Sequence, residues 1–271
     1  MQNTTDTTVL IVGSNGNAPG SQALKKAANA LGVAADIALV DSPETLERIQ
    51  KATQVIYRLR PKSYDTFLVL SQKLTGAHGD LLISMLNAFD KYKTYEILTS
   101  NNIATPNSRL IGPQATIETY PVVAKILNGN QGIGVALLAS DADFEDFKAT
   151  FPEEREFLLQ EFIEESKGAD ARLFVVGKRV VAAMRRVAET GDFRANIHLG
   201  ARMETYIPTA EEVELAIRAV SAFGLPYAGV DIIASNKGPL VLEVNPSPGF
   251  GIQEVSDTDI TAEVIKGVLN D

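Results

Sequence analysis

The first sixty residues alternate between short apolar runs and a segment with helical spacing. The apolar runs lie at residues 9–12, 36–40 and 54–58. Apolar positions at helical spacing cover residues 19–31 and stop at Gly32, a residue type that commonly follows a helix. Ser42 and Pro43 suit the N-cap and the first position of a second helix. Strands that alternate with helices predict a small parallel α/β unit over residues 1–88.

From residue 89 onward the expected strands follow one another more directly. A helical segment begins at Asp90 and Lys91 and ends near residue 101. Strands are then expected at residues 120–127, 135–139 and 157–163, and helices near 210–223 and 258–270. The pattern predicts a second unit over residues 89–165 and a third, made mainly of paired strands, over residues 166–271. The expected fold class is therefore mixed, α/β followed by α+β.

A β-hairpin near the C-terminus carries three hard oxygen ligands. Residues 226–234 and 239–245 are rich in aliphatic side chains, and the segment between them has turn chemistry. A turn centred on Lys237 places Asp231 opposite Glu243, and Asn245 shares the face of Glu243. Two carboxylates and an amide suit one or two Mg²⁺ ions and leave positions open for phosphate oxygens. Spacing alone leaves a solvated strand face open, but the apolar flanks favour buried acids, which need partners.

Composition narrows the classes of function. Hydrophobic residues make up 45% and charged residues 22% of the 271, as in an ordinary globular protein. The net charge of −9 argues against a general nucleic-acid partner, so an anionic ligand must be held by local Arg and Lys. The absence of cysteine excludes thiol catalysis and zinc–thiolate sites. Neither a membrane segment nor a leader is visible, so we expect a cytoplasmic protein.

A glycine-rich loop lies between two expected strands. Residues 128–134 contain Gly129, Gly132 and Gly134, and glycine lets backbone N–H groups approach a polyanion closely. Lys125 just before the loop and Lys91 upstream could supply charge to phosphate oxygens. The alternatives are a flexible hairpin turn and solvated lysines.

Gln160, Glu161, Phe162 and Ile163 end a strand at an expected domain junction. An exposed strand edge there could pair its backbone with an adenine ring, and Asp170 shortly after could accept a hydrogen bond from a ribose hydroxyl. The alternative is an ordinary edge strand followed by an aspartate in a loop.

Arginines gather in one segment of this acidic chain. They are Arg172, Arg185, Arg186, Arg194 and Arg202. Planar guanidinium groups suit carboxylates and transferring phosphoryl groups, although one or two of the five are expected to form surface ion pairs of little energetic value. Arg172 on a strand and Arg194, two residues before Asn196, are favoured for a site.

These residues together resemble a known family. The resemblance is carried by Lys91, Lys125, the loop at 129–135, Gln160, Glu161, Phe162, Ile163, Asp170, Arg172, the segment 191–196, residues 229–231, Glu243, Asn245 and the Pro-Ser-Pro-Gly tail at 246–249. In this order they are similar to the ATP-grasp ligases, and most of all to the RimK type, the glutamate ligases that modify the C-terminus of a ribosomal protein. The resemblance is specific over residues 89–261 and loose over residues 1–88.

The resemblance implies an ATP-grasp fold, in which an N-terminal Rossmann-like α/β domain over residues 1–88 precedes two α+β lobes that clasp ATP. Residues 89–165 would form the small central lobe, and residues 166–271 the C-terminal lobe with the Mg²⁺ site. The implied nucleotide-binding set is Lys91, Lys125, Gln131, Gly132, Gly134, Gln160, Glu161, Phe162, Ile163, Asp170, Arg194 and Asn196. The implied catalytic residues are Arg194, Asn196 and Arg172, and Asp231, Glu243 and Asn245 would hold two Mg²⁺ or Mn²⁺ ions.

The family reaction activates a carboxylate by phosphoryl transfer from ATP, and an amine then attacks the acylphosphate to give an amide. The resemblance therefore implies a ligase that adds L-glutamate to a protein, a peptide or a small-molecule acceptor, and family members often form homo-oligomers. One departure concerns the acceptor or amino-acid pocket. The family usually continues with His-Arg-Gly-Gly where this chain has His198, Leu199, Gly200 and Ala201, with Arg202 displaced.

Three alternatives remain at this stage. A LysX-type ligase that uses an amino-group carrier protein is disfavoured by the tail at 246–249. A nucleotide-binding regulator without catalysis is disfavoured by the retained site residues. A dinucleotide-binding protein is disfavoured because the loop at 13–20 lacks the GxGxxG pattern and suits a plain turn better than an anion site.

Overall fold

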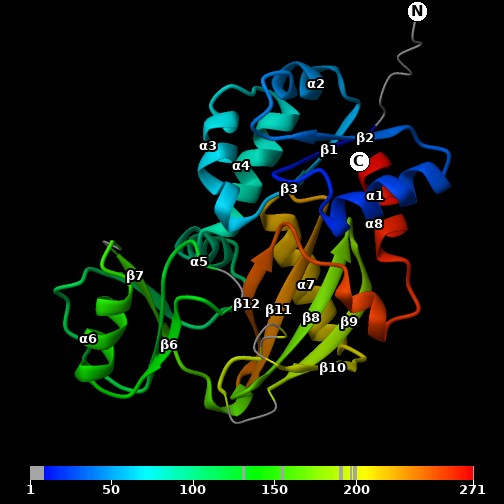
Figure 1. The fold of residues 1–271 in the computed structure, drawn as a ribbon. Coiled ribbons are helices and arrows are strands. Elements are labelled where there is room, and N and C mark those ends of the chain that lie inside the picture. Colours follow the sequence, from blue (N-terminus) through cyan, green and yellow to red (C-terminus); the bar gives the residue numbers. More distant parts are fainter. Residues whose placement is uncertain are drawn as a thin grey trace, which may run out of the picture.

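The computed structural model describes residues 9–129, 132–153, 156–188, 192–195, 197 and 200–270 (Figure 1). Within these residues the strands form three sheets, of three, four and five strands. The sheets follow the order that the sequence pattern predicts, a parallel α/β unit followed by antiparallel ones. No helix among the described residues combines the length and the apolar character needed to cross a bilayer.

The N-terminal unit is a parallel sheet of order β2-β1-β3. Its strands are β1 (Val9–Gly13), β2 (Ala35–Leu39) and β3 (Gln54–Arg58), and its helices are α1 (Pro19–Ala30), α2 (Thr45–Lys51), η1 (Pro61–Ser63), α3 (Tyr64–Ser71) and α4 (Ala77–Phe89). The prediction that Ser42 and Pro43 begin the second helix is wrong, because both lie in a preceding turn in which the Thr45 N–H donates to the Ser42 carbonyl. Helix α2 has Glu44 as its N-cap residue.

The central unit is an antiparallel sheet of order β4-β7-β5-β6. Its elements are α5 (Lys91–Ser100), β4 (Ser108–Ile111), β5 (Val122–Lys125), β6 (Val135–Leu138), α6 (Asp141–Thr150) and β7 (Phe157–Glu161). Asp90 caps α5 by accepting hydrogen bonds from the Tyr92 and Lys93 N–H groups, so the predicted helix start is confirmed. Helix α6 packs Phe144 and Phe147 against Phe157 and closes a small core of this unit.

The third unit is an antiparallel sheet of order β10-β9-β8-β11-β12. Its elements are η2 (Glu164–Ser166), β8 (Ala169–Val176), β9 (Arg179–Val187), β10 (Arg202–Thr205), α7 (Ala210–Ala222), β11 (Tyr227–Ser235), β12 (Gly238–Asn245), η4 (Gly251–Val255) and α8 (Ile260–Leu269). Helix α7 begins with a capping box between Thr209 and Glu212. The helices predicted near 210–223 and 258–270 are both present.

The N-terminal unit and the third unit share their hydrophobic core, although the central unit lies between them in the sequence. Buried Val9 and Ile11 of β1 pack in one cluster with Val264 and Ile265 of α8, and in Figure 1 the C-terminal helix lies beside α1. A second cluster joins buried residues of β1, β3 and α4 to α7, β8, β11 and β12. The N-terminal unit is therefore packed against the third unit through α8 on one face of its sheet and through α4, which contacts β12, on the other.

Candidate active site

A cleft of about 510 Å³ lies where the three units meet, and its lining contains most of the predicted site residues. The predicted residues found there are Lys91, Lys125, Gly132, Gln160, Glu161, Phe162, Ile163, Asp170, Arg172, Arg194, Asp231, Glu243 and Asn245. Gly134 is described but does not line the cleft, and Gln131 and Asn196 lie outside the described residues. Residues that are more than 150 positions apart in the chain are thus brought to one cavity.

The floor of the cleft is one face of the five-stranded sheet. Asp231 on β11 is opposite Glu243 on β12 and, on its other side, opposite Arg172 on β8. Residues directly opposite each other in an antiparallel pair point to the same face, and so do residues two apart on a strand. The floor therefore runs from Asp170 and Arg172 across Asp231 to Glu243 and Asn245.

The predicted pairing of Asp231 with Glu243 is confirmed, but its structural basis differs from the one expected. The hairpin turns through only two residues, Asn236 and Lys237, because Ser235 pairs with Gly238. That register alone would misalign the acids by one residue. A β-bulge beside Asp231 leaves Leu242 as the extra residue and restores the pairing.

Asp231 is more tightly held than a free metal ligand. Its carboxylate accepts hydrogen bonds from Arg172 Nε at 2.6 Å and Arg172 Nη2 at 2.7 Å, and Arg186 Nη2 lies 2.8 Å away. Arg186 in turn makes a two-pronged pair with Asp170, at 2.7 Å from Nε and 2.6 Å from Nη2. Two buried acids and two arginines thus neutralise one another, as buried charges require.

The network separates the acidities of its two aspartates. Burial tends to raise the pKa of Asp231, but Arg172 and Arg186 outweigh it and lower this pKa to about 2. Burial raises the pKa of Asp170 to about 6, because Arg186 only partly offsets burial and Asp231 adds repulsion. Asp170 therefore reaches the cleft already paired with Arg186, a partner that the sequence did not indicate.

Glu243 and Asn245 are the oxygen ligands that stay open to the cleft. The Glu243 carboxylate has no hydrogen-bond partner within the described part of the chain, and Asn245 Oδ1 accepts one bond, from the Ser247 N–H at 3.0 Å. No group of three His, Cys, Asp or Glu side chains suited to a metal occurs among the described residues. The predicted set has only two acids, and its third ligand is an amide. Since each carboxylate oxygen offers two lone pairs, Asp231 keeps one acceptor position after its three contacts. The donor set is thus all hard oxygen and fits Mg²⁺ or Mn²⁺.

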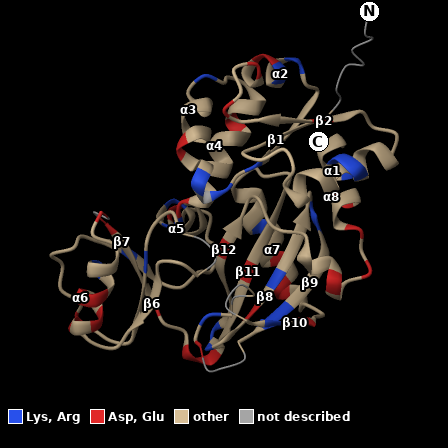
Figure 2. Cartoon of the chain, viewed as in Figure 1, with Lys and Arg blue, Asp and Glu red and all other residues tan. Residues whose placement is uncertain are grey.

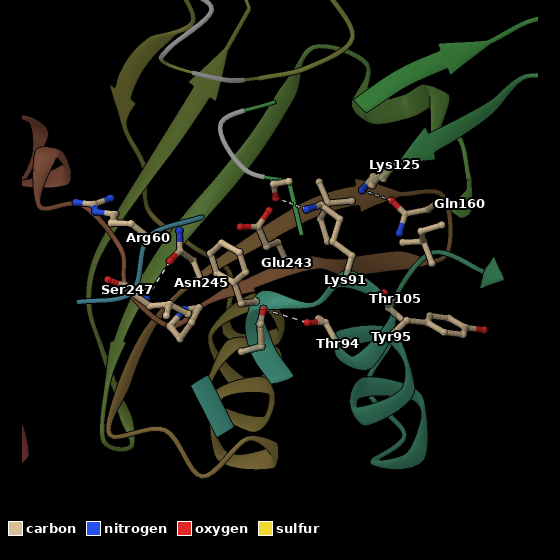
Figure 3. Close-up of a pocket in the computed structure, with 17 residues that line it drawn as sticks. Arg60, Lys91, Thr94, Tyr95, Thr105, Lys125, Gln160, Glu243, Asn245 and Ser247 are labelled. Atoms are coloured by element: carbon tan, nitrogen blue, oxygen red, sulfur yellow. Dashed lines mark hydrogen bonds between the residues drawn. The ribbon is translucent and has the colours of Figure 1, made fainter. Parts of the chain in front are cut away.

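Two lysines converge on the opposite wall (Figure 3). Lys91 Nζ donates to the Gly129 carbonyl, and Lys125 Nζ donates to Gln160 Oε1 at 2.6 Å. Burial and repulsion from Lys91 lower the pKa of Lys125 to about 8, and Glu243 opposes the shift. Burial also lowers the pKa of Lys91, again with Glu243 in opposition. A polyanion in the cleft would relieve this repulsion.

Arg194 connects the third unit to the glycine-rich loop. Its guanidinium pairs with Asp192 at 2.8 Å, and its Nη1 donates to the Gly132 carbonyl at 3.1 Å. Gly132 and Gly134 both have positive φ, +77° and +68°, which glycine adopts without strain. The loop therefore needs its glycines for its backbone shape, and Arg194 fixes its position over the cleft.

The expected edge strand at residues 160–163 is a wrong prediction. Strand β7 lies inside its sheet, between β4 and β5, so Gln160 and Glu161 already pair through their backbones. Phe162 and Ile163 follow the end of the strand and line the cleft. Backbone groups that could pair with an adenine ring therefore lie past the end of β7, at Phe162 and Ile163, and not along the side of the strand.

The structure also adds residues that the sequence reasoning did not select. Arg60 and Ser247 line the cleft beside Asn245. The carboxyl ends of parallel strands are the usual place for ligands in open α/β sheets, and Arg60 follows the end of β3, so this signal was present in the pattern. Arg202, by contrast, lies on β10 with a 62% exposed side chain paired with Glu204, and it does not line the cleft.

The cleft carries an excess of positive charge on an acidic protein. Of the described residues in its lining, seven are Lys or Arg and five are Asp or Glu. Figure 2 shows basic positions on β8, β9 and β10 among others on the N-terminal helices, and acidic segments on the outer helices and loops. Local cations thus favour an anionic ligand in this cavity despite the net charge of −9.

Comparison with known proteins shows which family the chain resembles in sequence. Residues 88–268 match the family model described as RimK-like ATP-grasp domain. A "Probable alpha-L-glutamate ligase" of Haemophilus influenzae (strain PittEE) is 45% identical over 190 residues, which cover 67% of this chain and 64% of that protein. The chain therefore spans just under two thirds of this relative. A protein of the same description from Picosynechococcus sp. is 40% identical over 235 residues, covering 81% of this chain and 77% of the relative.

Solved structures show the same fold at low identity. D-cycloserine synthetase DcsG superposes with a TM-score of 0.75 at 14% identity, over 97% of this chain and 99% of that one. A RimK domain protein ATP-grasp from Sphaerobacter thermophilus DSM 20745 gives 0.72 at 21% identity, over 96% and 99%. The fold is thus that of the ATP-grasp proteins, and the chain belongs to the RimK-like ATP-grasp family.

Proposed function

We propose that the protein is an ATP-dependent carboxylate–amine ligase that adds L-glutamate to a protein, peptide or small-molecule acceptor. The observation that carries the proposal is the convergence in one cleft of Lys91, Lys125 and Arg194 with the oxygen ligands Glu243 and Asn245. Cations on one wall and hard oxygens on the floor suit a nucleoside triphosphate with its divalent ion. The proposed division assigns residues 1–88 to the N-terminal domain and residues 89–165 and 166–271 to the two lobes.

Lys91 and Lys125 would bind phosphate oxygens, and backbone N–H groups of the loop containing Gln131, Gly132 and Gly134 would cover them. Glu161, Phe162 and Ile163 would hold the adenine near the end of β7, with Gln160 fixing Lys125 by its hydrogen bond. Asp170 would meet the ribose with the two lone-pair positions, one on each oxygen, that its pair with Arg186 leaves open.

The metal would be held by Glu243, Asn245 and the remaining lone pair of Asp231. A divalent ion there would neutralise phosphate charge during transfer. Arg172 and Arg186 keep Asp231 ionised and oriented, as its low pKa indicates. This arrangement explains how two buried acids can face the cleft before any ligand arrives.

The reaction would proceed by positioning and charge neutralisation. The carboxylate of one substrate would take the γ-phosphoryl group of ATP and ADP would leave. The amine of the other would then attack the acylphosphate, lose a proton and displace phosphate, which leaves an amide. Arg194, Asn196 and Arg172 would stabilise the charge on the transferring group. No protein nucleophile is required, which suits a chain without cysteine.

The choice of glutamate rests on the described relatives, which are named as probable alpha-L-glutamate ligases. A peptide acceptor is supported by a solved structure titled ATP-grasp ligase PsnB complexed with minimal precursor, with a TM-score of 0.71 at 21% identity over 98% of this chain and 99% of that one.

The test is phosphate release from ATP and Mg²⁺ with each of the twenty amino acids, with and without lysate peptides, followed by mass spectrometry of the products. We expect release that depends on glutamate and a mass gain of one or more glutamyl units on an acceptor. Release that depends on an amino-group carrier protein would instead indicate the LysX type. ATP binding without release in any mixture would indicate a nucleotide-binding regulator.

A further inference from the structure

Arg60 lies at the boundary between the N-terminal sheet and the cleft. It follows the carboxyl end of β3 by two residues, and its backbone is held by Ser63: the Ser63 N–H and Oγ donate to the Arg60 carbonyl at 2.9 and 3.0 Å, and the Arg60 N–H donates to Ser63 Oγ at 3.3 Å. The backbone is thus fixed while the side chain stays exposed. The positive charge of Arg60 therefore faces the cleft, and its side chain is not part of the hydrophobic core.

The other arginines near the cleft already have partners. Arg172, Arg186 and Arg194 pair with aspartates, and Arg58 is buried, donating to the Pro248 carbonyl at 3.0 Å with Phe250 beneath it. The Arg60 guanidinium has no acceptor among the residues that the structure describes, although it lines the cleft. Its positive charge is available to a ligand.

The position of Arg60 indicates which ligand group it would meet. Figure 3 shows Arg60 at the end of the cavity with Asn245 and Ser247, whereas Lys125 and Gln160 lie at the other end. Of the two lysines, Lys125 lies at the far end from Arg60, and Lys91 lies between them beside Glu243. A ligand group that reaches Arg60 therefore lies beyond Glu243 and Asn245 as seen from Lys125.

We propose that Arg60 forms a carboxylate subsite for the amino acid that the enzyme joins. The inference rests on the proposed ligase function and deepens it. A guanidinium offers two parallel N–H donors that match a carboxylate, so the pair fixes orientation as well as charge. With the carboxylate anchored on the N-terminal unit, the rest of the amino acid points back toward Asn245 and the reacting centre. The N-terminal unit thereby takes part in substrate selection.

The test measures equilibrium binding, so it does not depend on turnover. The full chain is loaded with Mg²⁺ and a non-hydrolysable ATP analogue, and the Kd is measured for L-glutamate, for L-glutamine and for the α-amide of glutamate. The proteins compared are the wild type, Arg60→Gln, Arg60→Lys and Lys62→Gln. Lys62 is exposed two residues away and does not line the cleft, so its variant removes the same charge without removing the subsite.

We expect Arg60→Gln to weaken glutamate binding at least tenfold, Arg60→Lys to weaken it less, and Lys62→Gln to leave it unchanged, with analogue affinity within twofold throughout. One of the two amides should bind the wild type as weakly as glutamate binds Arg60→Gln and should lose nothing further in that variant. That amide identifies the carboxylate that Arg60 holds.

Three results would overturn the inference. The first is that Arg60→Gln weakens the binding of both amides as much as it weakens the binding of glutamate. The others are that the variant changes nucleotide affinity instead of glutamate affinity, and that the loaded wild type binds no glutamate. The proposed function is judged separately, by amino-acid-dependent phosphate release from the wild type. If the wild type releases phosphate but the losses from Arg60→Gln and from the amide are additive, the ligase function stands and the Arg60 subsite is wrong. If the losses are not additive but no phosphate is released, Arg60 binds the carboxylate and the ligase function is wrong.

Discussion

At the scale of single residues, Asp231 shows where sequence reasoning succeeds and where it stops. The pattern of the hairpin predicts that Asp231 faces Glu243, because alternation along two adjacent strands can be counted. It does not predict Arg172 and Arg186 as partners, because those contacts depend on the alignment of β8 and β9, about 45–60 residues earlier. The local pair could be derived from the sequence, and the four-residue network could not.

Glu243 gives the sharpest single-residue prediction. Glu243→Gln keeps the size of the side chain but removes the charge that would balance the metal, so kcat should fall by about 100-fold or more while the circular dichroism spectrum stays unchanged. Glu214→Gln, on the exposed face of α7, is the matched control and should behave as the wild type. Normal activity of Glu243→Gln at limiting Mg²⁺ would remove Glu243 from the metal site.

The lowered pKa of Lys125 predicts a pH dependence of ATP binding. Its pKa of about 8 lies below the ordinary lysine value, so the free protein loses this positive charge as pH rises through 8. Bound phosphate stabilises the charged form, so the Kd for ATP should rise by up to tenfold per pH unit above pH 8. Calorimetric titration with ATP between pH 7 and 9.5 measures this slope. Lys125→Arg should flatten it, because a guanidinium stays charged throughout, and an equal slope in both proteins would rule Lys125 out as the cause.

At the scale of elements, long periodic segments were predictable and short ones were not. Helices α5, α7 and α8 have caps or periodicity that can be recognised in the sequence. Strand β4 has four residues, and its partner β7 is about fifty residues away, so nothing local marks it. Without β4, β7 has a partner on one side only, so the sequence pattern wrongly predicts β7 as an edge strand. The interior position of β7 moves the adenine hypothesis to Phe162 and Ile163, past the strand end.

The glycine-rich loop can be tested as an element. A methyl group at Gly134 would overlap the Ile126 side chain, and the φ of +68° is unfavourable for alanine. We expect Gly134→Ala to raise the Kd for ATP roughly tenfold by displacing the loop, with a stability loss of about 1–2 kcal/mol.

The matched control for the loop is Gly177→Ala. Gly177 also has a positive φ, +55°, but an added methyl group meets nothing within 4 Å, and the residue lies in the turn between β8 and β9, away from the cleft. It should lose a similar amount of stability and keep its ATP affinity, both measured by urea unfolding and by titration. Equal ATP affinities in the two variants would show that the loop does not cover the nucleotide.

At the scale of the whole molecule, the order of units could be predicted, but their packing could not. The switch from alternating strands and helices to paired strands is visible in the chain, and it places the units in order. The burial of β1 and α8 in one cluster joins residues about 250 positions apart, and no periodicity signals it. This packing brings Arg60 to the cleft. The sequence pattern therefore predicts site residues in the second and third units but not Arg60, which the N-terminal unit supplies.

A cleft shared by three units predicts that its ligands stabilise the whole chain. ATP with Mg²⁺ at about 100 times its Kd should add about 2.7 kcal/mol to the free energy of unfolding and raise Tm by roughly 5–10 °C. Removal of Mg²⁺ with a chelator should abolish most of this shift in the wild type, because the phosphates then face Glu243 without a cation between them. In Glu243→Gln that repulsion is absent, so ATP alone should stabilise this variant more than it stabilises the wild type. Differential scanning fluorimetry of both proteins, with and without Mg²⁺, decides the point. The same Mg²⁺ dependence in both proteins would show that the metal is bound elsewhere.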